Sequence, residues 1–193
     1  MSIDSRLKVA SGRLCLAGKM GSVYTGSGQV ILRKAPRRGM DTHLFSVLTS
    51  AADDLRLVLE VNSVDTALNV HAPGSRHASG RAVDMNKIGP FPGVAKQATL
   101  NNPHAMKLVQ YLRVNGWHVG EGGNWPAILF GSVHTSLNPS IYDHSTHLHV
   151  SIARQVLPGS AGDDVPDGSL CDAELSGEMS LLDSSDSEPP PDV

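Results

Sequence analysis

Cysteines and aromatic residues are scarce in this chain, and long apolar runs are missing. Only two of the 193 residues are cysteine, Cys15 and Cys171, which excludes a disulfide framework. A disulfide between them is the alternative, but Cys171 lies in a segment of disordered composition, so we expect both to be free thiols. No run of about 18 apolar residues occurs, so no membrane insertion is expected. No signal peptide is readable at the N-terminus either. With 4% aromatic residues, the core must be built from Leu, Val, Ala and Met.

Basic residues are absent from the C-terminal end, where acidic ones gather. Residues 158–193 hold ten of the nineteen acids and no Lys or Arg, so residues 1–157 combine nine acids with all sixteen bases, a formal charge of +7. The Ser-, Gly-, Asp- and Pro-rich composition of residues 158–193 is typical of disorder. We therefore predict one domain over residues 1–157, followed by an acidic disordered tail over 158–193.

The basic body indicates an anionic target, such as a cell-wall polymer or nucleic acid. Its densest basic stretch, RKAPRR at residues 33–38, is interrupted by Pro36 and contains no aromatic residue. Nucleic-acid sites usually combine bases with aromatic side chains, so a solvated loop is the preferred interpretation and nucleic acid is not the expected partner.

Capping residues and hydrophobic spacing predict two helices. Asp41-Thr42 precedes apolar residues at helical spacing over 43–56, and Asn102-Pro103 opens a second helix that Asn115-Gly116 closes. Residues 1–40 are Gly-rich and short-patterned, which predicts a hairpin or an N-terminal wrapping segment. Strand-like segments lie at residues 55–64, 81–85, 117–120, 127–133 and 147–152. This order predicts an α+β fold: a small, mostly antiparallel sheet with flanking helices.

Imidazoles and one carboxylate gather in two segments, SRHASGRAVD at residues 75–84 and HSTHLHV at 144–150. Gly80 allows a sharp turn after His77, and a strand over 81–85 brings Asp84 toward the same place. His147 and His149 are two residues apart in a β-type run, so they project from one face.

Together these segments offer four groups for one site. A catalytic zinc ion needs three protein ligands and an open position for water. The fourth group is then left for proton chemistry beside the metal.

The two segments resemble the S-x-H-x-x-G-x-A-x-D and H-x-H motifs of the lysostaphin / D-Ala-D-Ala metallopeptidase / hedgehog-type superfamily. The resemblance covers about residues 43–152. The seven-residue interval from His77 to Asp84 is similar to that of the D-Ala-D-Ala carboxypeptidase and phage L-alanyl-D-glutamate peptidase branch. The spacing of His144, His147 and His149 resembles the closing histidine cluster of the penicillin-insensitive murein endopeptidase.

This resemblance implies a hedgehog/D-Ala-D-Ala peptidase-like fold and a zinc site. His77, Asp84 and His149 match the zinc ligands, and His147 matches the histidine that contacts the water or the oxyanion. Ser75 matches the serine that opens the motif, which implies that it orients a metal ligand without itself binding the metal. His144 is a further candidate for a catalytic role.

The general base is the first point at which the chain departs from the family pattern. Carboxypeptidase-type members carry a catalytic Glu three residues before the last histidine, where this chain has Thr146. The base is then His147, as in the endopeptidase-like pattern, or Asp143 or Glu121.

Substrate binding is the second departure. Family members carry a substrate-binding Arg on the strand ahead of the first motif, and this chain has none there. Arg76 and Arg81 are the nearby substitutes, and Trp125, within the turn-like GEGGNW, is a candidate for substrate contact. The missing Arg favours endopeptidase over carboxypeptidase action.

The sequence therefore predicts a zinc-dependent peptidase that cuts stem-peptide or cross-link amide bonds of peptidoglycan. Without a readable signal peptide, we expect a phage lysin (endolysin) or a virion-associated wall hydrolase, synthesised in the cytoplasm and acting on the wall after release. One alternative is a cytoplasmic dipeptidase-type enzyme. Another, favoured by Thr146, is a non-catalytic zinc-containing module of the same fold, such as a virion component.

Overall fold

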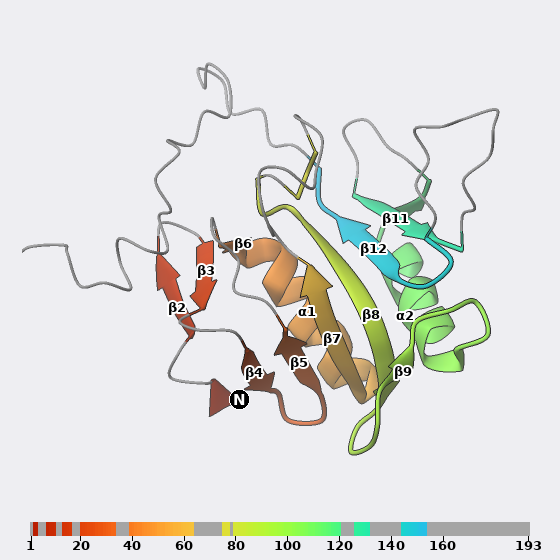
Figure 1. Ribbon diagram of the computed structural model, residues 1–193, viewed down its shortest axis with the longest axis horizontal. Coiled ribbons are helices and arrows are strands. Elements are labelled where there is room, and N and C mark those ends of the chain that lie inside the picture. The colour runs from red at the N-terminus through yellow and green to blue at the C-terminus, as the bar shows by residue number, and fades with distance from the viewer. Residues whose placement is uncertain are drawn as a thin grey trace, which may run out of the picture.

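Two helices and two β-sheets make up the described part of the chain (Figure 1). The structure is a computed structural model. It describes residues 2–3, 7–10, 13–16, 20–33, 39–63, 75–77, 79–120, 126–131 and 144–153.

The larger sheet has the strand order β1-β4-β5-β7-β8-β12-β11-β10, and β9 pairs with β8. Its strands are β1 (Ser2–Ile3), β4 (Gly21–Tyr24), β5 (Gln29–Leu32), β7 (Leu57–Ser63), β8 (Ala82–Pro90), β9 (Lys96–Gln97), β10 (His118–Val119), β11 (Ala127–Phe130) and β12 (Leu148–Ser151). Neighbouring strands run antiparallel, except that β5 is parallel to β7 and β10 is parallel to β11. The smaller sheet contains β2 (Leu7–Ala10), β3 (Arg13–Leu16) and β6 (Met40–Asp41), in the order β2-β3-β6.

The predicted α+β class with a mostly antiparallel sheet is confirmed, but the sheet is larger than the small one expected. The difference comes from residues 21–32, which form the β4–β5 hairpin and extend the sheet beside β7. Val30 and Leu32 alternate with less buried neighbours and are fully buried. Such short strands leave a weak sequence signal, because each contains only two inward-facing residues.

The helices begin where their caps predict. Helix α1 (Thr42–Leu55) follows Asp41, whose side chain accepts the backbone N–H groups of His43 and Leu44. Helix α2 (Pro103–Val114) follows Asn102, whose side-chain oxygen accepts two N–H groups of the first turn. These bonds satisfy donors that have no partner within the helix.

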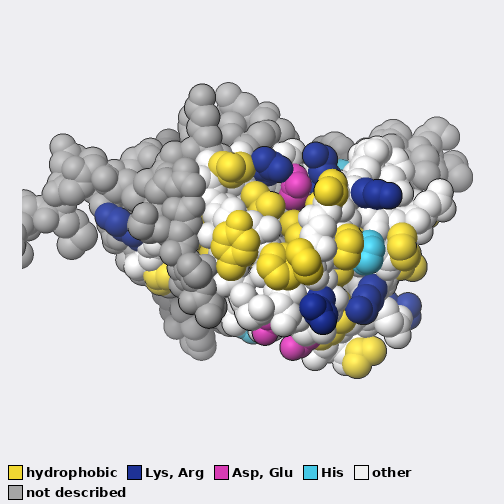
Figure 2. Space-filling view, turned by 90° about the horizontal axis from the view of Figure 1, so that it is seen from below, with side chains coloured by type: hydrophobic (Ala, Val, Ile, Leu, Met, Phe, Trp, Pro, Cys, Tyr) yellow, Lys and Arg dark blue, Asp and Glu magenta, His cyan; other side chains and the backbone are white. Residues whose placement is uncertain are grey.

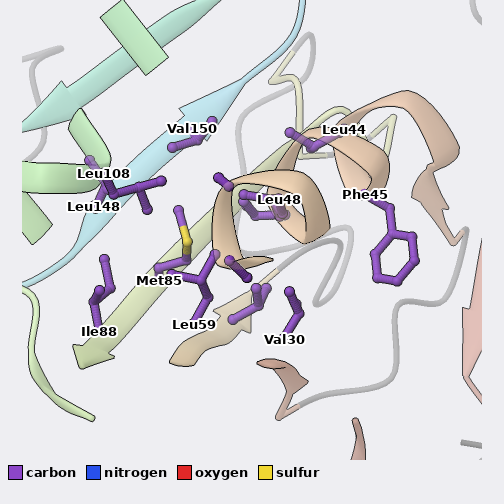
Figure 3. Close-up of a cluster of buried hydrophobic side chains, with 14 of the residues drawn as sticks. Val30, Leu44, Phe45, Leu48, Leu59, Met85, Ile88, Leu108, Leu148 and Val150 are labelled. Atoms are coloured by element: carbon purple, nitrogen blue, oxygen red, sulfur yellow. The ribbon is translucent and has the colours of Figure 1, made fainter. Parts of the chain in front are cut away.

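Both helices cover one face of the larger sheet. On that face Val30 and Leu59 are cross-strand neighbours, as are Met85 and Leu148. Figure 3 shows these side chains packed with Leu48 of α1 and with further apolar residues. Burial of this apolar area is the main stabilising term. The opposite face of the sheet carries polar side chains, among them those of the candidate site.

Cys15 lies in β3, is almost fully buried and is disulfide-bonded. The expectation of a free thiol at this position is therefore wrong. Composition alone does not reveal which distant segments meet in the fold, and pairing depends on that geometry. Cys171 and the predicted tail over 158–193 lie outside the described residues. Among the described residues, no helix has the length and apolar character needed to cross a membrane.

Asp53 of α1 anchors the β4–β5 turn. Its Oδ1 accepts the backbone N–H of Ser27 at 2.5 Å and the hydroxyl of Thr25 at 2.8 Å. These two hydrogen bonds hold the pKa of Asp53 below its usual range. A depressed carboxylate pKa stabilises the folded state above the unfolded-state pKa, and this contribution is lost as pH falls.

Asp53→Asn should therefore lower the melting temperature at pH 7, because the amide carries no charge for the two donors. The difference from wild type should shrink as pH falls below about 4, because the Asp53 carboxylate of the unfolded wild-type chain becomes protonated there and that of the folded chain at lower pH. Thermal melts between pH 3 and pH 7 measure this difference. A difference that stays constant over this range would contradict the assignment.

Candidate metal centre

A tight loop presents His77 to the open face of the sheet. The His77 carbonyl accepts the Gly80 N–H at 2.9 Å, and the Gly80 carbonyl accepts the Asp41 N–H at 2.9 Å, which ties the loop to the start of α1. Arg13 of β3 also donates to the Ser79 carbonyl. The smaller sheet and α1 thus hold the loop that carries His77. Nothing in the local sequence indicated Arg13, because this contact joins residues 66 positions apart.

Gly80 has a φ of +66°, the left-handed region that favours glycine. A Cβ here would lie 2.1 Å from the Gly39 carbonyl oxygen, so the turn has no room for a side chain. The predicted sharp turn at Gly80 is confirmed. Glycine is needed here partly because the backbone of Gly39 comes close, and the sequence did not reveal this contact.

Asp84 and His149 are direct cross-strand partners on β8 and β12. Their strand neighbours Met85 and Leu148, which also pair with each other, are fully buried in the core. Alternation then directs Asp84 and His149 to the opposite, open face. The expected geometry, with both motifs converging from one face, is what the structure contains.

Three ligand-type atoms from these residues lie within hydrogen-bonding distance of one another. His149 Nδ1 is 3.0 Å from Asp84 Oδ1 and 3.1 Å from His77 Nε2, and His77 Nε2 is 3.4 Å from Asp84 Oδ1. His77, Asp84 and His149 therefore form a group that can hold a metal ion. No other such group of three occurs among the residues that the structure describes.

The electrostatics of this group favour the protonation states that ligands need. Burial would raise the pKa of Asp84, but hydrogen bonds with His149 and His77 outweigh it and hold that pKa far below its usual range. Burial lowers the pKa of His149, although its hydrogen bond with Asp84 acts in the opposite direction. A carboxylate and a neutral imidazole, the forms that bind metals, are thus present at neutral pH.

Two further histidines border the group. His147 lies just before β12, with its Nε2 3.8 Å from Asp84 Oδ1. Its side chain is 22% exposed, compared with 5% for His77 and 12% for His149. The His144 ring is buried, with its centroid 4.8 Å from that of His147 and 5.7 Å from that of His149. His147 is therefore the more accessible of the two to a bound molecule.

The remaining predicted residues occupy different surroundings. Ser75 Oγ accepts the backbone N–H of His77 at 3.3 Å, so it braces the loop. Arg76 Nη1 donates to Ser151 Oγ at 2.8 Å, two residues beyond His149 on β12. Burial lowers the pKa of Arg76.

Arg81 lies on the other side of the sheet. Its carbonyl accepts the N–H of Ile152, a core residue, and alternation places the Arg81 side chain on that same helix-covered face. Its Nε and Nη1 atoms are buried and have no hydrogen-bond partner. Arg76 is therefore better placed than Arg81 to replace the substrate-binding Arg of the family pattern.

Thr146 is exposed in the bend before β12, and Asp143, Glu121 and Trp125 lie outside the described residues.

Neither a protein-family model, nor a curated protein, nor a solved structure matches this chain.

Gly80→Ala tests whether the loop geometry supports the metal group. The variant should lose about 2–3 kcal/mol of stability and bind metal more weakly, because the loop must shift to relieve the contact with Gly39. Gly116→Ala is the matched control: Gly116 has a φ of +88°, but a Cβ at this position would have no atom within 4 Å. Denaturant unfolding and metal titration measure both effects. Equal metal affinities in the two variants would contradict the role of the loop.

Proposed function

We propose that this chain is a zinc-dependent peptidase that acts on peptidoglycan stem peptides or cross-links. The observation that carries the proposal is the convergence of His77, Asp84 and His149 from two distant motifs. The order and spacing of those motifs resemble the lysostaphin / D-Ala-D-Ala metallopeptidase superfamily.

The spacing of the three atoms supports zinc as the metal. Zinc binds nitrogen and carboxylate oxygen at about 2.0–2.2 Å in a tetrahedral arrangement, which separates ligand atoms by about 3.3–3.5 Å. The separations of 3.0–3.4 Å are close to that value. Two imidazoles and one carboxylate also match zinc, whereas calcium takes about six to eight oxygen ligands. Three protein ligands leave one position open, as catalytic zinc sites require.

Zinc bound here would lower the pKa of a water molecule toward neutrality and polarise the scissile carbonyl. The chain's own groups supply the rest of the chemistry. His147, partly exposed beside Asp84, is placed to exchange a proton with the reacting groups and to stabilise negative charge on the carbonyl oxygen. The His144 ring packs against the His147 ring, with their centroids 4.8 Å apart.

Arg76 supports the assignment of a peptide substrate. Its guanidinium is held by Ser151, on the strand that also carries His149. From there it can bind a carbonyl or a carboxylate of a peptide lying across the open face. The formal +7 charge of residues 1–157 further favours an anionic substrate such as the cell wall. A phage lysin or a virion-associated hydrolase fits these properties.

A second candidate is a non-catalytic zinc-containing module. The specific observation in its favour is Thr146, an exposed residue at the position of the family's catalytic Glu. Zymography on cell walls, paired with a zinc assay of the same preparation, separates the two candidates. A peptidase clears the walls and loses this activity with chelator. Zinc binding without clearing over many wall types would support the module and contradict the peptidase.

A further inference from the structure

A bulge in β8 places Lys87 on the same face of the sheet as the metal group. Glu60 of β7 pairs with Lys87, but the next residue, Val61, pairs with Met85, so Asn86 has no partner on β7. Met85 and Ile88 are fully buried, whereas Asn86 and Lys87 between them are both exposed. In an unbroken strand Lys87 would face the helices, because successive side chains alternate. Bulges are frequent next to active sites, where they redirect side chains.

Lys87 and Arg33 share one carboxylate on this face. Glu60 Oε2 on β7 accepts Arg33 Nε at 3.0 Å and lies 2.9 Å from Arg33 Nη2 and 3.9 Å from Lys87 Nζ. The Glu60 side chain is 13% exposed, whereas those of Arg33 and Lys87 are 41% and 52% exposed. The trio carries a net charge of +1, with its cations toward solvent. Figure 2 shows basic and hydrophobic side chains mixed over the side of the molecule seen from below, with few acidic ones.

This trio lies within reach of a peptide bound at the metal group. Lys87 follows Asp84 by three residues on β8, a distance of about 10 Å along the strand. An extended peptide covers the same distance in about three residues. A substrate lying along β8, with its scissile carbonyl beside Asp84, would therefore bring a group two or three residues away next to Lys87.

We propose that Lys87 and Arg33 form a subsite for a substrate carboxylate two or three residues from the scissile bond. This inference rests on the proposed peptidase function and specifies its substrate class: an acidic peptide whose carboxyl group is free, not amidated. Glu60 orients both cations in advance and neutralises only one of them. The remaining positive charge attracts a carboxylate and gains little from a neutral amide.

Matched substrates test the subsite. Soluble peptidoglycan fragments are compared with matched fragments that carry an amide only in place of the carboxyl group two or three residues from the scissile bond, and kcat/KM is measured for both. Wild type should prefer the carboxylate form by about fivefold, the scale of exposed ion pairs. Lys87→Met should reduce this preference to about twofold or less, and Lys87→Glu should remove or reverse it. Zinc content should stay unchanged in both variants.

Lys96→Met is the control variant. Lys96 is exposed on β9 and pairs with Ile88, whose side chain faces the helices, so this variant loses the same charge from the opposite side of the sheet. It should keep the wild-type preference. Two results for Lys87→Glu would overturn the subsite while the peptidase function stands. One is an unchanged preference for the carboxylate fragments; the other is an equal loss of kcat/KM for the carboxylate and the amidated fragments. If zinc-loaded wild type cleaves neither fragment set, the peptidase proposal fails and the subsite fails with it.

Discussion

Purified protein is expected to bind one zinc ion per chain, and replacing His77, Asp84 or His149 by alanine should abolish tight binding. Each variant removes one of three atoms that lie within 3.4 Å of one another. Two remaining ligands hold zinc far more weakly. Elemental analysis after mild dialysis measures the stoichiometry, and a ratio near zero that added zinc does not restore would contradict the site.

The same variants should also lose the stability that zinc confers. A ligand that binds only the folded state stabilises it by about 4 kcal/mol at a free concentration 1,000 times its Kd. The melting temperature of wild type should therefore rise with added zinc, and that of the three variants should not. His43→Ala is a suitable control, because His43 is exposed on α1 and only its backbone N–H takes part in the helix cap. It should behave as wild type in both measurements.

His147→Ala is expected to keep near-stoichiometric zinc and to lose most wall-degrading activity. His147 lies outside the group of three, yet its Nε2 is 3.8 Å from Asp84 Oδ1 and its side chain is partly exposed. Loss of a group that transfers protons or stabilises the transition state commonly lowers rates by about 10²–10⁴-fold. His149→Ala should instead lose both zinc and activity.

Parallel zinc and activity assays on these two variants separate the roles within H-x-H. The assignment is reversed if His147→Ala loses the metal while His149→Ala retains it. If His147→Ala degrades walls at the wild-type rate, the general base lies elsewhere, and Asp143 and Glu121 are the next residues to replace.

Local chemistry made part of this fold predictable. Asp41 and Asn102-Pro103 marked the two helix starts because N-cap side chains act on backbone groups only two or three residues away. Alternation likewise predicted that Asp84 points away from the side of Val83 and that His149 points away from the core, since side-chain direction in a strand follows from position alone. The pairing of β8 with β12, which brings these two residues together, comes from the structure.

Contacts between distant segments were not predictable in this way. The disulfide bond of Cys15, the Arg13 contact with Ser79 and the place of the β4–β5 hairpin beside β7 all depend on how separate segments pack. The bulge at Asn86 was also not predictable from the sequence. It interrupts the alternation of side chains along β8, so the sequence did not reveal that Lys87 is exposed on the face of the sheet that carries Asp84 and His149.

The most direct test of the peptidase proposal is mass spectrometry of purified muropeptides after incubation with the protein, with and without chelator. We predict fragments from the hydrolysis of one kind of peptide bond, their disappearance after chelation and their return when zinc is added back. Unchanged muropeptides after prolonged incubation with protein that carries one zinc ion per chain would contradict the proposal.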